Sequence, residues 1–320
     1  MLIYCKRLSK KLLLLVFSVL IVFLIILKLK SNYFDHVYHF SDTSLDDIDF
    51  DSYSRSHPFL NITGFNQLIV PNIVHLVQLD TPYISFITYL CIKAAIKNQK
   101  PDILIIHTNQ NHLLGKYWNY LKNESIKVRK VDKPLTIFGK SVAHVYHSSD
   151  ILRLTILIEY GGIYIDNDLL ILKNLDPFRR FECSIGWPVN EYIGNQLIIA
   201  HKDSRFIKKW FDSYRSYNGS SWYFNGGQLP TKLILYSHPD YVHRETESFG
   251  VAAEVNYLYK SSKTDWSSKF NTIHLLDRHR SYLVPDERIK YFNEINIKSY
   301  NRTFGAMARQ ILFDSPDLVF

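Results

Sequence analysis

Residues 148–168 restrict the fold of this chain more than any other stretch. They begin with Ser148, Ser149 and Asp150, residue types that favour helix N-caps, and a segment rich in leucine and isoleucine follows. The pattern predicts a buried helix that starts there. Gly161-Gly162 predicts its end, because glycine readily adopts the left-handed conformation found at helix C-caps.

Two aspartates end the short strand predicted over residues 163–165. In an extended chain, side chains at positions i and i+2 point the same way, so Asp166 and Asp168 form an acidic pair. Hard divalent cations such as Mg²⁺ and Mn²⁺ bind carboxylate oxygens and leave positions open for phosphate. The pair therefore favours a metal site that holds a diphosphate, as in an enzyme that uses nucleotide sugars. A solvated Asp-Asn-Asp turn is the alternative.

The order Ser-Asp-x-x-Arg, apolar helix, Tyr-Gly-Gly-Ile-Tyr-x-Asp-x-Asp over residues 149–168 resembles the sugar-binding segment of glycosyltransferase family 32. It also resembles the glucosyltransferase domain of the large clostridial toxins. The continuation through residues 174–178 is similar to the animal alpha-1,4-glycosyltransferase-like members. The resemblance implies an α/β, GT-A-like fold, in which a Rossmann-like nucleotide-sugar-binding sheet carries helices on both faces.

The same resemblance implies a function. We expect a metal-dependent hexosyltransferase-like enzyme that moves a sugar from a nucleotide sugar to a glycan, glycolipid or glycoprotein acceptor with retention of configuration. The expected cofactor is Mn²⁺ or Mg²⁺, and a UDP-sugar is favoured over a GDP-sugar as donor. A non-catalytic, membrane-tethered carbohydrate-binding relative of the fold is the alternative.

The resemblance also implies roles for individual residues. Asp168 would bind the metal directly, and Asp166 would reach it through water or contact the donor ribose. Asp150 and Arg153, at i and i+3 of one helical face, would contact the donor sugar, with a helix cap and a local ion pair as the alternatives. His274 is the candidate third ligand, to the metal or to the diphosphate, with a buried core histidine as the alternative. Further candidates for donor or acceptor contacts are His75, Leu76, Asn195, Gln196 and Asn225.

Charge argues against a nucleic-acid partner. The net charge is +8, but residues 1–30 hold six basic and no acidic residues, which leaves 32 basic and 30 acidic residues in the remainder. No basic domain is therefore expected. Neither a dinucleotide-binding glycine motif nor a P-loop motif occurs.

The N-terminal region predicts a membrane anchor. Leu12 to Leu27 carries no charge, and more basic residues precede this run than follow it, which favours a cytoplasmic N-terminus. The expected parts are a cytoplasmic tail (1–11), a transmembrane signal-anchor (12–29), a lumenal stem (30–65) and a catalytic domain (66–320). The chain would then be a type II protein of the Golgi or ER membrane. A cleaved signal peptide is the alternative. Four Asn-x-Ser/Thr sequons agree with a lumenal glycoprotein and begin at Asn61, Asn123, Asn218 and Asn301.

The folded part is expected to alternate strands and helices. Buried strands are predicted over residues 69–77, 102–107 and 126–131, with helices over 84–98 and 115–122. Such alternation favours a parallel sheet covered on both faces, with ligands beyond the carboxyl ends of its strands. Cys91 and Cys183 are either one disulfide or two free thiols.

Overall fold

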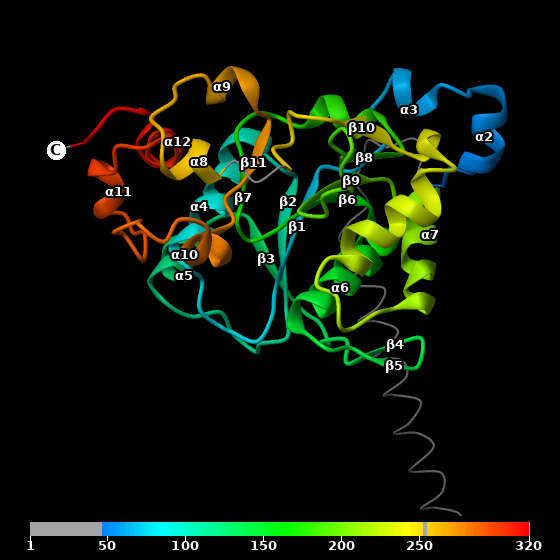
Figure 1. Cartoon of the computed structure of the whole chain (residues 1–320), viewed down its shortest axis with the longest axis horizontal. Helices are drawn as coiled ribbons and strands as arrows, with labels where there is room; N and C mark the ends of the chain where they lie inside the picture. The colour runs from blue at the N-terminus through cyan, green and yellow to red at the C-terminus, as the bar shows by residue number, and fades with distance from the viewer. Residues whose placement is uncertain (1–46, 252–254, 320) are drawn as a thin grey trace, which may run out of the picture. The chain divides into compact units, whose positions relative to one another are not determined.

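A seven-stranded sheet forms the centre of the folded chain (Figure 1). The computed structural model describes residues 47–251 and 255–319. The predicted cytoplasmic tail, membrane anchor and most of the stem lie outside these ranges. Within them, no helix is both long and apolar enough to cross a membrane.

The sheet is mixed rather than fully parallel. Its strand order is β10-β8-β9-β6-β1-β2-β3. β9 runs antiparallel to both of its neighbours, β6 and β8, whereas the other pairs are parallel. The strands are β1 (Ile73–Gln78), β2 (Ile103–Thr108), β3 (Ile126–Lys130), β6 (Gly162–Ile165), β8 (Cys183–Gly186), β9 (Leu197–Ala200) and β10 (His243–Glu245).

The direction of β9 decides what lies at the functional edge of the sheet. No helical crossover separates β8 from β9, so the chain returns beside β8 in the opposite direction. The beginning of β9 therefore lies at the same edge as the carboxyl ends of β1 and β6. Asn195 and Gln196, which come directly before β9, are placed at that edge.

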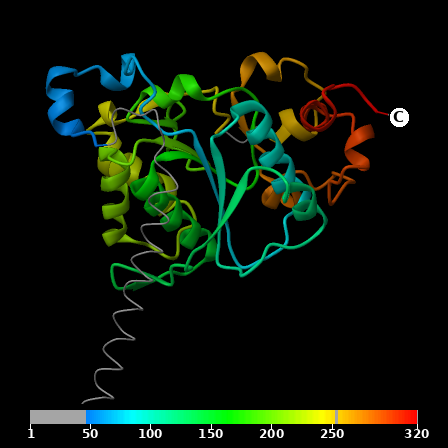
Figure 2. The same cartoon turned by 180° about the vertical axis from the view of Figure 1, so that it is seen from behind.

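Helices cover both faces of the sheet, as predicted (Figures 1 and 2). On one face, Val74, Leu76 and Leu104 pack with apolar residues of the α4 region and α5. On the other face, Val77 and Tyr164 pack with α6 and α7. The eleven α-helices within the described ranges are α2 (Phe50–Ser56), α3 (Leu60–Thr63), α4 (Phe86–Ala94), α5 (Lys116–Leu121), α6 (Val145–Tyr160), α7 (Arg205–Ser213), α8 (Val255–Tyr259), α9 (Trp266–Lys269), α10 (Arg280–Leu283), α11 (Asn296–Ser299) and α12 (Thr303–Phe313).

A third apolar core joins the C-terminal part to the sheet domain. Residues of α8, α9, α11 and α12 pack against one side of α4 and against Leu170. Leu170 belongs to β7 (Leu169–Ile171), which pairs antiparallel with β11 (Thr272–His274). A further two-stranded ribbon consists of β4 (Thr136–Ile137) and β5 (Lys140–Ser141). This third core fixes β11, and thus His274, beside the sheet.

Helix α6 begins earlier than predicted. Its N-cap is His144, so Ser148, Ser149 and Asp150 lie inside the helix and do not cap it. The Ser148 hydroxyl donates instead to the Pro134 carbonyl, 2.8 Å away. The cap prediction was wrong because these residue types also serve helix interiors when a tertiary acceptor satisfies them. The predicted C-cap at Gly161 is confirmed.

The N-terminal boundary also differs from the prediction, because residues 50–63 form two packed helices where a stem was expected. Phe50 and Leu60 are buried in the first core. Asp49 accepts a hydrogen bond from the Ser52 amide and so caps α2. Some of the aspartates that suggested a solvated stem therefore belong to folded structure.

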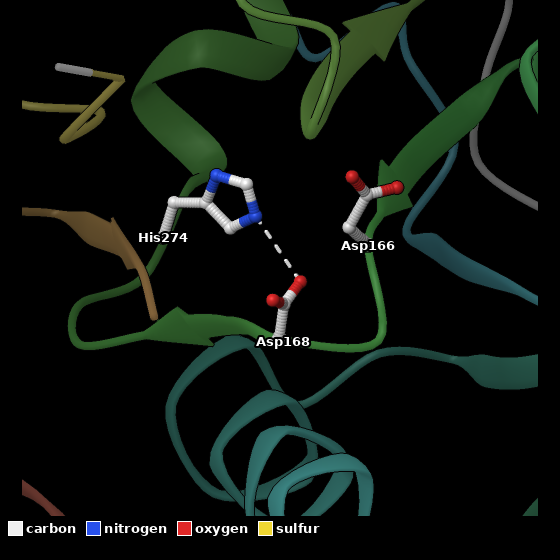
Figure 3. Close-up of side chains that lie close together, drawn as sticks. All are labelled: Asp166, Asp168 and His274. Atoms are coloured by element: carbon white, nitrogen blue, oxygen red, sulfur yellow. Dashed lines mark hydrogen bonds and ion pairs between the residues drawn. The ribbon is translucent and has the colours of Figure 1, made fainter. Parts of the chain in front are cut away.

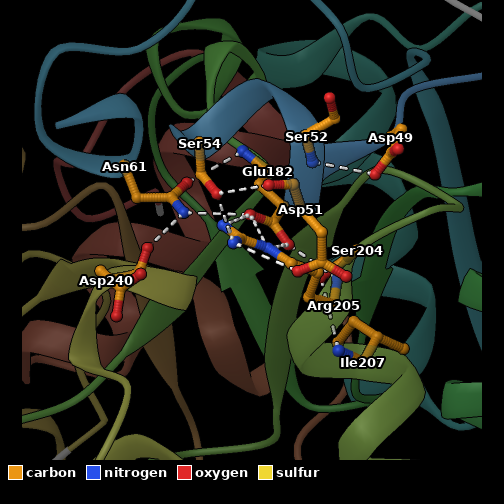
Figure 4. A network of polar contacts seen from close by, with 10 residues as sticks. All are labelled: Asp49, Asp51, Ser52, Ser54, Asn61, Glu182, Ser204, Arg205, Ile207 and Asp240. Atoms are coloured by element: carbon orange, nitrogen blue, oxygen red, sulfur yellow. Dashed lines mark hydrogen bonds and ion pairs between the residues drawn. The ribbon is translucent and has the colours of Figure 1, made fainter. Parts of the chain in front are cut away.

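A buried polar network holds these helices against the sheet (Figure 4). The Glu182 carboxylate is fully buried and accepts from the Arg205 side chain, with Nη2 to Oε2 at 2.7 Å. Asn61 donates to Glu182 and to the Asp240 carbonyl, and it accepts from the Glu182 amide. Arg205 also donates to Ser54 of α2. One ion pair thus connects α2, α3, β8 and α7.

Both cysteines of the described chain are free thiols. Cys91 lies in the third core and Cys183 in the core beneath α6 and α7, and each is fully buried. Burial raises the pKa of both thiols well above the ordinary value. Their separation into different cores rules out the disulfide alternative.

Two histidines on neighbouring strands form a buried pair. His75 Nε2 lies 3.0 Å from the Gly161 carbonyl, which can only accept, so Nε2 carries the proton. His75 Nδ1 then accepts from His107 Nε2 at 3.0 Å, and His107 Nδ1 has no partner within the described residues. Burial lowers the pKa of His75 to about 4 and that of His107 to about 2.

We predict that removing either partner of the Glu182–Arg205 pair destabilises the fold strongly. Glu182→Ala or Arg205→Ala leaves an unpaired buried charge, which costs roughly 3–5 kcal/mol of unfolding free energy. Urea denaturation measures this. Arg215→Ala is the matched control, since Arg215 and Asp212 form an exposed pair, and it should change little. Equal midpoints for the Arg205 and Arg215 variants would contradict the assignment.

We also predict a loss of stability on acidification that depends on the histidine pair. Between pH 6.5 and about 4 the unfolded chain binds protons that folded His75 excludes, so stability falls as pH falls. A pKa lowered from 6.5 to about 4 corresponds to at most about 3 kcal/mol. His107→Gln keeps a hydrogen-bond donor for His75 and removes one histidine that stays unprotonated in the folded state. The unfolding free energy from urea denaturation should therefore differ less between pH 7 and pH 5 than in the wild type. Exposed His57, changed to Gln, is the control; an unchanged pH dependence in His107→Gln would refute the prediction.

Candidate active site

A cleft of about 840 Å³ opens at the edge of the sheet where β1 and β6 end and β9 begins. Ligands of α/β sheets bind at this edge because the chain leaves the strands there and its loops surround an open crevice. The cleft is lined by Gln78 from the end of β1, by Asp150 and Arg153 of α6, and by the segment 166–168 after β6. His274 and the residues that follow β11 form a further wall, in which His274 lies beside Asp168.

The three predicted metal ligands lie together in this cleft (Figure 3). Asp166, Asp168 and His274 each offer one ligand atom, and these atoms lie within 4.8 Å of one another. His274 Nε2 is 3.1 Å from Asp168 Oδ1. Two carboxylates and one imidazole at this spacing suit a single divalent ion such as Mn²⁺ that keeps positions open for phosphate oxygens.

A tight turn positions the two aspartates. The Leu169 amide donates to the Asp166 carbonyl at 3.0 Å, so a tight turn separates β6 from β7. The Asn167 side chain donates to Gln78 at the end of β1, 2.7 Å away. The prediction that the pair shares a direction in extended chain was therefore wrong, and this turn brings both carboxylates to the cleft.

Strand pairing brings His274 to the turn. In the antiparallel pair of β7 and β11, His274 lies opposite Leu169, the residue after Asp168. The Leu275 amide also donates to the Asp168 carbonyl at 2.9 Å. A residue 106 positions later in the chain thus reaches the aspartate through backbone hydrogen bonds.

Electrostatics keep Asp168 ionised. Burial by itself raises its pKa, but the charge and hydrogen bond of His274, the Asp277 amide and the charge of Arg278 outweigh burial and lower the pKa below the ordinary value. Burial lowers the pKa of His274, and Asp168 outweighs this and raises it. The carboxylate is therefore available as a ligand at neutral pH.

Arg153 connects the helix to the strand end. Its Nη2 lies 3.0 Å from Asp150 Oδ1 and 3.1 Å from Asp166 Oδ1. The Tyr164 hydroxyl donates to the same Asp166 oxygen at 2.9 Å. The predicted i, i+3 contact of Asp150 and Arg153 is present, and the pair also extends to the acidic turn.

Asp150 differs from Asp168 in its environment. Burial raises its pKa to about 6, although Arg153 and the Asn195 amide act in the opposite direction. Asn195 Nδ2 donates to Asp150 Oδ1 at 2.9 Å. The cleft thus holds one carboxylate that stays ionised over a wide pH range and one that takes up a proton near pH 6.

Three other predicted donor contacts have side chains committed to the interior of the fold. Leu76 is part of the core, and His75 faces His107 and the Gly161 carbonyl. Asn225 is fully buried, donates to the Asn218 carbonyl at 2.7 Å and accepts from its amide at 2.9 Å. The residues near the end of β1 that line the cleft are instead those from Val77 to Thr81.

Sequence reasoning missed several residues of the cleft. Tyr164, which supports Asp166, lies between the two buried isoleucines of the strand and was read only as part of it. Arg278 is exposed and lines the cleft beside Asp168. The one clue to this location in the sequence is that Arg278 follows the candidate ligand His274 by four residues. His279 also lines the cleft. Trp222 lines it as well, and it was not missed: the aromatic residues of the second half, Trp222 among them, are candidates for a sugar-stacking wall from the sequence alone, with a core position as the alternative.

Comparison with known proteins adds to this geometry. Residues 88–185 match the family described as "Glycosyltransferase sugar-binding region containing DXD motif". "Glucan organizing enzyme 1" of Cryptococcus neoformans is 28% identical over 191 residues, which cover 54% of this chain and 51% of that protein. "Lactosylceramide 4-alpha-galactosyltransferase" of Rattus norvegicus is 30% identical over 87 residues, 27% of this chain and 23% of its own length.

The chain therefore spans about half the length of the first of these relatives and less of the second. Among solved structures, "PaToxG Glycosyltransferase" aligns with 59% of this chain and 76% of its own, at 18% identity and a TM-score of 0.43. The matched segment contains Asp150, Arg153, Asp166 and Asp168. The resemblance predicted from residues 148–178 is thus confirmed as a match to the glycosyltransferase sugar-binding region with the DXD motif over residues 88–185.

Proposed function

We propose that this protein is a metal-dependent glycosyltransferase that moves a sugar from a nucleotide sugar to a glycan or glycoconjugate with retention of configuration. The observation that supports this best is the cluster of Asp166, Asp168 and His274 beside the Asp150–Arg153 pair in one cleft. The first two members of the cluster and the pair all belong to the matched sugar-binding segment. Such a site offers groups for both halves of a nucleotide-sugar donor.

In this proposal the donor lies across the edge of the sheet. Asp166, Asp168 and His274 would hold Mn²⁺ or Mg²⁺, which neutralises charge on a leaving diphosphate. Exposed Arg278 adds a positive charge on the same wall. Arg153 holds Asp166 in position and, with Asp150, faces the donor sugar. The nucleotide extends toward residues 77–81 at the end of β1.

The proposed transfer exchanges one bond for another. The bond between the anomeric carbon and the diphosphate oxygen breaks, and a bond from the acceptor hydroxyl oxygen to the same carbon forms. The hydroxyl proton is taken up by the released diphosphate. The anomeric configuration of the product, read by NMR, tests retention.

Asp168→Asn and His274→Gln test the proposed site. Each removes a metal ligand, so turnover of a donor panel of UDP-sugars and then GDP-sugars should fall at least about 100-fold. EDTA should abolish wild-type turnover and Mn²⁺ restore it. Asp212→Asn, an exposed carboxylate outside the cleft, is the control, and melting curves verify folding.

Wild-type turnover in EDTA would overturn metal dependence. A folded wild-type protein that binds glycans but turns over no nucleotide sugar would favour the carbohydrate-binding alternative.

We further propose that residues 12–29 anchor the chain in a Golgi or ER membrane with the folded part in the lumen. In that compartment, glycans are expected on Asn123, Asn218 and Asn301, which are exposed. Asn61 should stay unmodified in the folded protein, because its amide is buried and bonded to Glu182 and Asp240. Mass spectrometry of the full chain made in eukaryotic cells measures occupancy; absence of glycan at all three exposed sites, or a glycan on Asn61, would contradict this.

A further inference from the structure

Trp222 differs from the other tryptophans in its surroundings. Trp187, Trp210 and Trp266 are buried, and Trp118 packs against the first core. Trp222 is 53% exposed and lines the cleft. A large aromatic ring that is half exposed in the cleft contributes little to the core and leaves a face available to a ligand.

Two aromatic rings contact the Trp222 indole at steep angles, and neither stacks face to face on it. The Tyr146 ring, at the start of α6, lies 5.0 Å away at an interplanar angle of 64°. The His279 ring, on the wall that follows β11, lies 5.1 Å away at 80°. Tyr146 itself stacks on His144 at 4.8 Å. These tilted contacts restrain the indole and leave it open to a flat partner.

The segment that carries Trp222 passes beside the proposed sugar site. A Cβ atom on Gly226 would lie 3.2 Å from Asp150 Oδ2 and 2.6 Å from Asn195 Nδ2, so the backbone approaches both residues closely. A side chain at this position would require the Asn195 amide to shift. Trp222 is therefore four residues from a point of contact with Asp150.

An unsatisfied donor lies at the same edge. Gln196 is 4% exposed and lines the cleft, and its Nε2 group has no hydrogen-bond partner within the described residues. Buried amides without a partner are rare, because each costs free energy. A ligand hydroxyl in the cleft would satisfy this group once the Gln196 amide, whose nitrogen is buried, turns toward the cleft.

The sheet order separates this wall from the donor's nucleotide. β1 lies on one side of β6, and β9, with Asn195 and Gln196 before it, lies on the other. A nucleotide at the end of β1 and a diphosphate at the acidic turn leave the β9 side for the second substrate. Aromatic faces bind the apolar C–H faces of pyranose rings, whereas a nucleotide's charge and base are already accommodated elsewhere.

We propose that Trp222 is the acceptor platform, on which a pyranose ring at the end of a glycan stacks while Gln196 binds one of its hydroxyls. The proposal rests on the proposed function and deepens it: the acceptor is a sugar, not a polypeptide hydroxyl. Tyr146 and His279 are positioning residues that keep the indole in place.

Two measurements on the full chain test the platform. In the first, donor hydrolysis and transfer to lactose, maltose or N-acetyllactosamine are compared for wild type, Trp222→Ala and Trp222→Phe. Trp222→Ala should raise the KM for acceptor about tenfold, an effect within the range of one aromatic contact. Its kcat and its rate of donor hydrolysis should stay within about twofold. Trp222→Phe should restore part of the affinity. Tyr291→Ala, an 85% exposed aromatic residue outside the cleft, should change nothing.

The second measurement needs no turnover. Intrinsic fluorescence is titrated with the same sugars, and with octyl lactoside in micelles to separate free glycans from glycolipid headgroups. Wild type should show a saturable change that Trp222→Phe loses. A saturable fluorescence change in the wild type that Trp222→Phe loses, without donor turnover in any variant, would refute the proposed function and keep the platform. If the protein hydrolyses the donor but Trp222→Ala leaves the acceptor KM and the sugar binding unchanged, the platform alone is overturned. If Trp222→Ala lowers the rate of donor hydrolysis as much as the rate of transfer, Trp222 is reassigned to the donor site.

Discussion

The chain reversal at Gly161 and Gly162 is the constraint on which the site depends. Both residues have positive φ, and a Cβ on Gly162 would lie 2.8 Å from the Ile73 carbonyl and 2.9 Å from His75. Another residue type would force β6 away from β1. Arg153 precedes the reversal by about 12 Å of helix, at ~1.5 Å per residue, and Asp166 follows it by about 13 Å of strand, at ~3.3 Å per residue. The two lengths match, so the guanidinium meets the carboxylate at the edge of the sheet.

Pairing of charges keeps this arrangement compatible with burial. Arg153 is shared by Asp150 and Asp166, and Asp168 is shared by His274 and the Asp277 amide. Isolated buried charges are costly, but charges that share partners hold each other in fixed positions. The pairing also explains why two aspartates of one cleft differ, since Asp150 relies on partners that only partly offset its burial, whereas those of Asp168 more than offset it.

Each wall of the cleft depends on a different part of the chain. The sheet and α6 provide Asp150, Arg153 and the acidic turn, while the third core around α4 fixes β11 and so provides His274. The segment from Trp222 to Gly226 provides the wall nearest β9. Because these parts lie far apart in the chain, with 106 positions between Asp168 and His274, the cleft forms only when the apolar cores do.

The sequence by itself determined the local elements and the identity of the principal charged residues. The apolar runs predicted β1, β2, β3, β6 and the helices between them, and the glycine pair predicted the end of α6, because these signals depend on neighbouring residues. Asp150, Arg153, Asp166 and Asp168 were found from one contiguous pattern. His274 was a candidate ligand, but its apolar neighbours in the sequence were equally consistent with a buried core histidine.

Only the tertiary structure decided how distant segments meet. The antiparallel β9, the pairing that brings His274 to Asp168, and the exposure of Trp222 alone among five tryptophans all result from long-range packing. The aspartates of residues 30–65 suggested a solvated stem, but Phe50 and Leu60 anchor two helices there. Asn225 was a predicted ligand contact, but its side chain supports a loop. Local patterns specify what a residue is able to do, whereas its partners, and hence its role, depend on contacts between residues far apart in the chain.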